Sequence, residues 1–305
     1  MTPRVSVVLP TWNRRELLLQ ALGSVQNQTF GDLEILVCDD GSTDGSREAV
    51  EAVARTDARI RWVQGAHSGL PGVNRNRGIR AARGEWIAFQ DSDDLWVPGK
   101  LERQLAVRKA SPDAAFVYGY AVDLSPDGAR RRMTPFRVQR GGRMFETLLL
   151  YSLVQTPTVL VRRELLERAG LFDEAMGLTA AEDYELYLRL AARAPFHFVP
   201  EDLVHCRAQP GGLSADVLAG IDQVERVVKA AIEREKVGPA LAARALARLD
   251  LRRYRLLLLR GAPAQERLPP LRSALERDPG YLLARALLVA DRAGGAGLVR
   301  LLAGS

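Results

Sequence analysis

The amino-acid sequence predicts an α/β protein: a doubly wound, mixed sheet followed by an all-helical extension. Short apolar runs alternate with amphipathic stretches, polar clusters follow these runs directly, and residues 215–305 show helical patterns only. The chain has 305 residues, of which 47% are hydrophobic and 26% are charged. This composition is typical of a globular protein and excludes a largely disordered chain.

Strand and helix patterns alternate through the first hundred residues. Leu18, Leu22 and Val25 recur at the spacing that gives a helix one apolar face. Alternation at this spacing favours parallel strands connected by helices. The predicted strands are Val5–Pro10, Glu34–Asp40, Arg59–Gln64 and Glu85–Asp91, and the predicted helices are Arg15–Gln26, Thr43–Arg55 and Val73–Ala82.

The second half has a mixed pattern. A strand is predicted over Phe116–Val122, a strand leading into a helix over Thr156–Gly170, and a helix over Ala181–Ala192. The acidic start of this last helix suits the helix dipole. From about Val217 the pattern is helical almost to the end. Breaks are predicted at Gly238–Pro239, Gly261–Pro263, Pro269–Pro270 and Asp278–Gly280.

The charge is unevenly distributed along the chain. There are 43 Lys and Arg against 37 Asp and Glu, a formal net charge of +6. Residues 215–305 contain 16 of the basic and 10 of the acidic residues, so residues 1–214 hold 27 of each. We therefore predict a neutral domain over 1–214 and a basic helical extension over 215–305.

Cysteine usage and hydropathy bear on the compartment. Cys38 and Cys206 lie in strand-like runs and suggest neither a disulfide framework nor a zinc site. The first apolar run is shorter than a signal peptide, and no run reaches the ~18 residues of a membrane span. We expect a cytoplasmic protein.

Polar clusters follow three of the predicted strands. They are Thr11 with Asn13, then Asp39–Ser42, then Asp91–Asp94. In an open parallel sheet the ligand crevice lies at the carboxyl ends of the strands, so these clusters should converge on one cleft.

The acidic cluster Asp91–Asp94 has a metal-binding character. Three carboxylates within four residues repel one another, and a hard cation such as Mg²⁺ or Mn²⁺ relieves that repulsion. The alternative is a solvated turn in which an Asp caps the next helix. The pair Asp39–Asp40 precedes a glycine turn, so one carboxylate can accept hydrogen bonds from a nucleobase or a ribose, whereas Ser42 and Asp44 are explained by capping.

Four segments, in order, resemble glycosyltransferase family 2, a group of inverting enzymes with the GT-A fold. The resemblance extends over about Arg4–Ser214. The segments are Val5–Ser46, Val73–Asp94, Gly170–Glu174 and Ala181–Ala191.

The resemblance implies a donor site in residues 1–100, a nucleotide-binding half. Pro10, Trp12 and Asp40 would hold the base of a nucleoside diphosphate sugar, with Asp39 a weaker candidate, and Trp12 would stack on that base. The remaining donor-binding residues would be Arg75, Asp91 and Ser92. Arg75 suits an anionic diphosphate; for Arg77 a surface charge is at least as good an explanation.

The same resemblance implies a divalent metal and a catalytic base. Asp91–Asp93 resembles the Asp-x-Asp signature, so Asp93 and Asp91 would bind Mg²⁺ or Mn²⁺, with Asp94 as a substitute ligand. The metal would stabilise the departing diphosphate.

Residues 101–214 would form the acceptor and catalytic-base half. Glu182–Asp183 matches the family's Glu-Asp pair, with Asp183 as the base that takes the acceptor proton. Displacement from the opposite side of the sugar gives inversion. Arg207 would reach the diphosphate, while Gln209 stands where many relatives have histidine.

The predicted function is therefore sugar transfer from a nucleoside diphosphate sugar to a glycan or lipid-linked saccharide. Neither a Gln-x-x-Arg-Trp signature nor a membrane span occurs, which favours a non-processive enzyme. A dehydrogenase and a P-loop kinase are disfavoured because their glycine motifs are absent.

One alternative is a module with a degenerate catalytic body that binds a sugar nucleotide or an anionic surface such as a membrane. The segment Leu251–Arg260 mixes leucines and arginines, so contact with the inner face of a membrane stays open beside simple packing on the body. Nucleic-acid binding is disfavoured because residues 215–305 hold only two aromatic residues, Tyr254 and Tyr281.

Overall fold

The computed structural model describes residues 2–124, 130–133, 140–207 and 217–292. The chain divides into two compact units. The sheet unit is Met1–Leu148 with Ser152–Gly212, and the helical unit is Leu149–Tyr151 with Leu213–Ser305. The boundary predicted after residue 214 falls, like Gln209, outside the described residues and stays a prediction.

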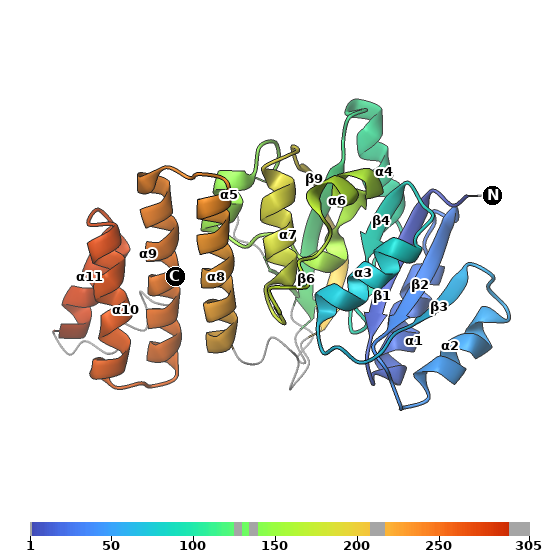
Figure 1. Cartoon of the computed structure of the whole chain (residues 1–305), viewed down its shortest axis with the longest axis horizontal. Helices are drawn as coiled ribbons and strands as arrows, with labels where there is room; N and C mark the ends of the chain where they lie inside the picture. The colour runs from blue at the N-terminus through green and yellow to red at the C-terminus, as the bar shows by residue number, and fades with distance from the viewer. Residues whose placement is uncertain (1, 125–129, 134–139, 208–216, 293–305) are drawn as a thin grey trace. The chain divides into compact units, whose positions relative to one another are not determined.

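Four parallel strands form the first half of the sheet, in the spatial order β3-β2-β1-β4 (Figure 1). A helix connects each strand to the next along the chain, as the alternating patterns predicted. The elements are β1 (Val5–Thr11), α1 (Arg15–Gln26), β2 (Leu33–Asp39), α2 (Ser46–Ala54), β3 (Ile60–Gln64), α3 (Pro71–Ala81) and β4 (Trp86–Phe89).

The second half makes the sheet mixed. Strand β8 runs antiparallel to β4 and β6, β9 runs parallel to β6, and β5 runs antiparallel to β9. Among the described residues the order is β3-β2-β1-β4-β8-β6-β9-β5, with β7 paired to β6. The elements are β5 (Leu95–Trp96), α4 (Lys100–Ala110), β6 (Phe116–Leu124), β7 (Arg130–Arg132), α5 (Phe145–Leu150), the 3₁₀ turn η1 (Thr156–Thr158), β8 (Leu160–Arg162), α6 (Arg163–Ala169), α7 (Glu182–Ala191) and β9 (His197–Arg207).

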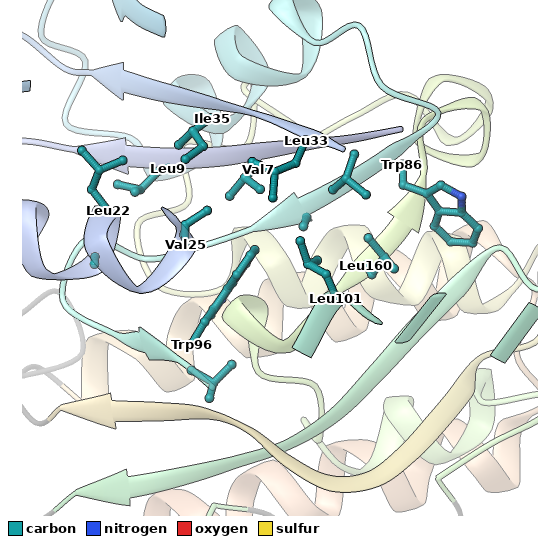
Figure 2. Packing of buried hydrophobic residues seen from close by; sticks show 14 of the residues in the cluster. Val7, Leu9, Leu22, Val25, Leu33, Ile35, Trp86, Trp96, Leu101 and Leu160 are labelled. Atoms are coloured by element: carbon teal, nitrogen blue, oxygen red, sulfur yellow. The ribbon is translucent and has the colours of Figure 1, made fainter. Parts of the chain in front are cut away.

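One face of the sheet packs on α1, α2 and α4. Val7 and Leu9 of β1 and Ile35 of β2 contribute to a cluster with Leu22 and Val25 of α1 (Figure 2). All five side chains are fully buried. Their alternation along the strands places one set of apolar side chains on this face.

Helix α3 packs on the opposite face and comes very close to it. A Cβ added at Gly78 would lie 2.6 Å from Cys38 Sγ and 2.6 Å from Val8 Cγ1. Only glycine leaves room for such an approach without displacing these side chains. The close packing fixes the position of α3, which carries Arg75 one turn earlier.

The helical unit contains α8 (Val217–Arg234), α9 (Pro239–Leu259), α10 (Ala264–Arg277) and α11 (Leu282–Arg292) (Figure 1). Its last three helices share a buried cluster that includes Leu251, Tyr254, Leu271 and Leu287. The predicted fold class, an α/β body with a helical extension, is confirmed. No helix within the described ranges combines the length and the apolar character needed to cross a membrane.

The break predicted at Pro269–Pro270 is wrong, because both prolines lie inside α10. Each proline removes one hydrogen bond to the residue four positions earlier, which normally kinks or ends a helix. Leu271 and Ala274 follow directly and are fully buried in the cluster of the helical unit. Tertiary packing therefore holds this helix together where local propensity does not.

Candidate active site

The polar clusters at the strand ends meet at one edge of the sheet. Thr11 at the end of β1 is paired in register with Asp39 at the end of β2, and Val8 with Phe89 at the end of β4. Asp91 follows two residues after Phe89. The shared edge predicted from the sequence is therefore present.

Arg75 connects two of the predicted motifs. Its Nη2 donates to Asp91 Oδ1 at 2.8 Å and its Nη1 donates to Glu182 Oε1 at 2.5 Å, with the guanidinium only 7% exposed. Burial by itself lowers the pKa of Arg75, but Asp91 and Glu182 outweigh it and raise that pKa above its ordinary value. Arg75 is thus a buried cation between the Asp91–Asp94 loop and the start of α7.

The Asp91–Asp94 loop is crowded with carboxyl groups. Burial and nearby Asp91 raise the pKa of Asp93, although Arg14 Nη1 donates to Asp93 Oδ2 at 2.5 Å and opposes this. Burial, Asp91 and Asp93 raise the pKa of Asp94 to about 8. Asp94 accepts hydrogen bonds from Cys206 Sγ at 3.2 Å and from the backbone N–H of Arg207 at 3.1 Å.

The raised pKa values of Asp93 and Asp94 bear on whether this loop suits a cation. In the described residues, no three His, Cys, Asp or Glu side chains are arranged to enclose a metal ion. The charge of Asp91 nevertheless disfavours the ionised form of Asp93, and a divalent cation bound to this loop would relieve that repulsion. The donor set of carboxylate oxygens suits Mg²⁺ or Mn²⁺. The predicted metal ligands stay a prediction.

Asp183 lies at the start of α7, where a neighbouring hydroxyl orients it. Thr156 Oγ1 donates to Asp183 Oδ2 at 2.6 Å, and Tyr187 Oη donates to Thr156 Oγ1 at 3.1 Å. The other oxygen, Oδ1, accepts the backbone N–H of Tyr184 at 2.7 Å. The carboxylate is therefore held from two sides while it remains partly exposed.

Glu182, its neighbour, is buried and serves a different purpose. Burial and nearby Asp183 raise the pKa of Glu182, and Arg75 opposes the shift. Because only 6% of Glu182 is exposed and Arg75 covers its carboxylate, it is not accessible to an acceptor. Of the predicted pair, Asp183 is the residue with an open side.

The two aspartates at the end of β2, Asp39 and Asp40, hold backbone turns. Asp39 accepts the N–H groups of Gly41 and Ser42 at 3.1 and 3.0 Å. Asp40 accepts the N–H groups of Ser68 and Gly69 at 3.0 and 2.9 Å. Burial raises the pKa of Asp40, but these hydrogen bonds reverse the effect and lower it below its ordinary value.

Trp12 lies exposed at this edge, where it stacks on His67. The ring centroids are 4.7 Å apart with an interplanar angle of 22°, and 49% of Trp12 is exposed. His67 Nδ1 lies 3.0 Å from the carbonyl oxygen of Asp40. Trp12 thus has one face on His67, which in turn contacts Asp40.

The other predicted donor residues lie close by in the fold. Pro10 is in β1, opposite Cys38 of β2, and Ser92 is buried in the carboxylate loop. Arg207 Nε donates to the carbonyl oxygen of Asp93, and its Nη1 donates to Gln20 Oε1. Arg207 therefore braces the loop.

Four residues of this site were not assigned a role from the sequence. They are Arg14, His67, Arg77 and Thr156. Arg77 Nη1 donates to Asp40 Oδ1 at 3.0 Å, so the charge of this partly exposed side chain is paired within the site. Each of the four acts through a partner at least 27 positions away in the chain, which local pattern does not reveal.

The fold and this edge define an α/β architecture with charged and polar side chains gathered at the carboxyl ends of parallel strands. Residues 6–170 match the family model for glycosyl transferase family 2. Because this is more than half of the chain, the chain belongs to that family, and the predicted enzyme class, glycosyltransferase, is confirmed. The matched residues include Asp40, Arg75 and Asp91–Asp94 but end before Asp183.

Curated relatives agree with this family. A GalNAc(5)-diNAcBac-PP-undecaprenol beta-1,3-glucosyltransferase of Campylobacter jejuni is 40% identical over 119 residues, 38% of each chain. EpsJ of Bacillus subtilis, an uncharacterized glycosyltransferase, is 31% identical over 225 residues, 70% of this chain and 64% of that protein. The chain spans 36% of the length of EpsH, a putative glycosyltransferase of Bacillus subtilis that is 37% identical over 127 residues.

Solved structures agree on the fold. Residues 1–349 of TarS from S. aureus, in complex with UDP-GlcNAc, superpose with a TM-score of 0.68 at 21% identity, covering 99% of this chain and 91% of that chain. The mannosyltransferase PcManGT from Pyrobaculum calidifontis, in complex with GDP-Man and Mn²⁺, gives a TM-score of 0.66 at 22% identity and covers 100% and 85%. The predicted GT-A fold is thereby confirmed.

Proposed function

We propose that the chain is an inverting, non-processive glycosyltransferase that moves a sugar from a nucleoside diphosphate sugar to a hydroxyl acceptor. The observation that carries the proposal is the Arg75 bridge, which joins Asp91 to Glu182, the neighbour of Asp183. A donor-binding loop and a carboxylate base thus belong to one site. Complexes of TarS with UDP-GlcNAc and of PcManGT with GDP-Man support a nucleotide-sugar donor.

Asp183 is the base that takes the acceptor's hydroxyl proton. Thr156 fills one lone pair of Oδ2, so the carboxylate faces the acceptor in one fixed orientation. Attack from this side, opposite the departing diphosphate, gives a single displacement with inversion.

Asp93 and Asp91 are the residues that would hold a divalent cation, with Asp94 as a substitute. Such a cation, when bound, supplies Lewis-acid stabilisation of the charge on the leaving diphosphate. The crowded carboxylates and the Mn²⁺ in the PcManGT complex support this assignment. Arg14, now paired with Asp93, lies where it can neutralise the same charge.

The nucleoside would bind beside Trp12, with Pro10 and Ser92 nearby. The exposed indole face offers a stacking surface to a base. Asp40 and Asp39 shape the backbone around this surface through the turns that they hold. Arg207 supports the carboxylate loop from its other side.

A lipid-linked saccharide is the proposed acceptor. The Campylobacter jejuni relative and an Escherichia coli relative, 35% identical over 115 residues, are both named for undecaprenol-linked substrates. Membrane contact through the helical unit would bring the enzyme to such an acceptor. Its exposed Leu259, Leu282 and Val289, together with its excess of basic residues, support this contact at an inner membrane face.

A donor screen tests the proposal. Melting temperatures are measured with UDP-glucose, UDP-GlcNAc and GDP-mannose, each with and without MnCl₂. We expect one donor at about 100 times its Kd to add about 2.7 kcal/mol of stability in the presence of metal. No shift with any donor would favour the alternative in which a degenerate body binds an anionic surface, whereas a shift without any nucleotide release would favour a module that only binds the sugar nucleotide.

A further inference from the structure

Side chains from β5 and α4 hold the short turn that presents Thr156 to Asp183. Trp96 Nε1 donates to the carbonyl oxygen of Pro157 at 3.0 Å. Gln104 Nε2 donates to the carbonyl oxygen of Thr158 at 2.8 Å and to that of Val117 at 3.1 Å. Two successive carbonyls of the turn η1 are thus fixed by side chains rather than by backbone.

Lys100 fixes these two side chains in turn. It is fully buried, its Nζ donates to Gln104 Oε1 at 2.8 Å, and Nζ lies 4.0 Å from the centroid of the Trp96 ring. Carbonyl oxygens only accept, so Gln104 Nε2 must face the turn, and the amide oxygen that remains faces Lys100 Nζ. Burial lowers the pKa of Lys100 well below its ordinary value.

The chain of contacts leads directly to the proposed base. From Lys100 it passes through Gln104 and Trp96 to η1, and Thr156 of that turn donates to Asp183 Oδ2 at 2.6 Å. Trp96 also lies two residues after Asp94, at the end of the carboxylate loop. The network therefore joins the donor-side loop to the residue that receives the acceptor proton.

We infer that Lys100, Gln104 and Trp96 are positioning residues that set the orientation of Asp183 through Thr156, an inference that rests on the proposed role of Asp183 as base. Apolar residues of similar volume could fill this space at little loss of stability, because a buried polar group contributes little net stability once its desolvation is counted. Apolar residues could not, however, donate hydrogen bonds to the carbonyl oxygens of η1 and so could not fix its position. A displacement of about 1 Å at a reacting group can lower a rate by about 100-fold.

The first experiment changes only the hydroxyl next to the base. The readout is nucleoside diphosphate release, with water as acceptor, from whichever of UDP-glucose, UDP-GlcNAc and GDP-mannose the wild type cleaves with MnCl₂. We expect Thr156→Val to lower kcat by about 10- to 100-fold with the donor KM within about twofold. Thr156→Ser, which keeps the hydroxyl, should restore kcat. Wild-type kcat in Thr156→Val would overturn the inference.

The second experiment separates positioning from folding. Gln104→Met should lower kcat because η1 loses a hydrogen-bond donor, and it should lower the melting temperature because the buried Lys100 Nζ loses its partner. The double variant Lys100→Met with Gln104→Met removes both polar groups, so its melting temperature should return towards wild type while kcat stays low. If kcat instead follows the melting temperature across these variants, the network is merely structural and the inference fails.

Two further variants complete the test. Trp96→Phe removes only the indole N–H and should lower kcat at least fivefold even if the Gln104 variants do not fold. Lys109→Met makes the same change as Lys100→Met on the exposed side of α4 and should leave both readouts unchanged. If the wild type releases nucleotide from none of the donors, the proposed function fails. Release by the wild type with no loss in any network variant contradicts this inference alone.

Discussion

The sheet unit and the helical unit handle their charged side chains differently. In the described chain the buried charged residues all belong to the sheet unit, among them Arg75, Glu182 and Lys100. In the helical unit, ion pairs such as Arg253 with Asp222 connect helices at a partly exposed surface. Both units bury apolar clusters, so the difference does not come from a lack of core.

This difference suggests that charged side chains of the sheet unit serve the site, whereas those of the helical unit connect helices. Burying a charged group costs several kcal/mol of desolvation, so a folded protein retains such a group only where opposite charges and hydrogen bonds offset that cost. Exposed pairs contribute about 0–1 kcal/mol and tolerate exchange. Five of these buried charges, Asp39, Asp40, Arg75, Asp94 and Glu182, belong to the edge where the sugar transfer is proposed to occur. Others serve structure: Glu34 lies at the start of β2, and Glu185 pairs with Arg189 within α7. The most enclosed carboxylate of the helical unit, Asp291, is paired with Arg267 between helices.

The largest expected effect comes from the proposed base. Asp183→Asn should lower donor turnover by about 10²- to 10⁴-fold, because an amide accepts no proton. UDP binding, followed by calorimetry, should change by less than about twofold. Weaker UDP binding with turnover largely intact would move Asp183 to the donor side of the site.

Metal removal tests the carboxylate loop next. Excess chelator should reduce turnover at least 100-fold, and added MnCl₂ or MgCl₂ should restore it, because the leaving diphosphate then lacks its Lewis acid. Asp93→Asn should require far more metal for the same rate. Turnover that is unchanged in chelator would show that the buried carboxylates serve structure alone.

Arg75, which bridges Asp91 and Glu182, should contribute strongly to the free energy of unfolding. Arg75→Met leaves the carboxylates of Asp91 and Glu182 without their shared cation, and we expect a loss of about 3–5 kcal/mol in urea unfolding. The matched control is Arg80→Met on the same helix, whose guanidinium is 58% exposed; it should cost about 0.5 kcal/mol or less. Equal losses of unfolding free energy in the two variants would contradict the proposed difference between buried and exposed charges.

Asp40 gives a smaller, pH-dependent effect. Its folded pKa lies below the ordinary value of 3.8, so the stabilisation from its ionised form is present above about pH 4 and is lost as the pH falls through the folded pKa. Asp40→Asn lacks this contribution. The difference in melting temperature between wild type and variant should therefore shrink from pH 7 to pH 3, and a constant difference would contradict the assignment.

The smallest expected effect is binding of anionic membranes by the helical unit, and added salt should abolish this binding. The full chain should co-sediment with vesicles rich in phosphatidylglycerol at low ionic strength and detach at about 0.5 M salt. Leu282→Ser with Val289→Ser should weaken this binding. Equal sedimentation with neutral and anionic vesicles would leave the basic residues with a packing role only.

Local pattern predicted much of the fold and the sheet edge at which the polar clusters meet. The alternation of strands and helices placed Asp40 and Asp91–Asp94 at strand ends, and the motif order indicated the family now confirmed. Pattern failed at Pro269–Pro270, where burial of Leu271 outweighs the lost hydrogen bonds of the prolines. The pattern also did not reveal that the Arg77 guanidinium binds Asp40.

The sequence by itself determined which residue types stand at the carboxyl ends of the strands, because strand and helix periods are local properties of the chain. Only the tertiary structure decided their partners. Arg75 meets Glu182 across 107 positions, Arg14 meets Asp93 across 79, and Thr156 meets Asp183 across 27. Such contacts depend on sheet register and on how closely α3 and α7 pack, and no periodicity within a short segment encodes either.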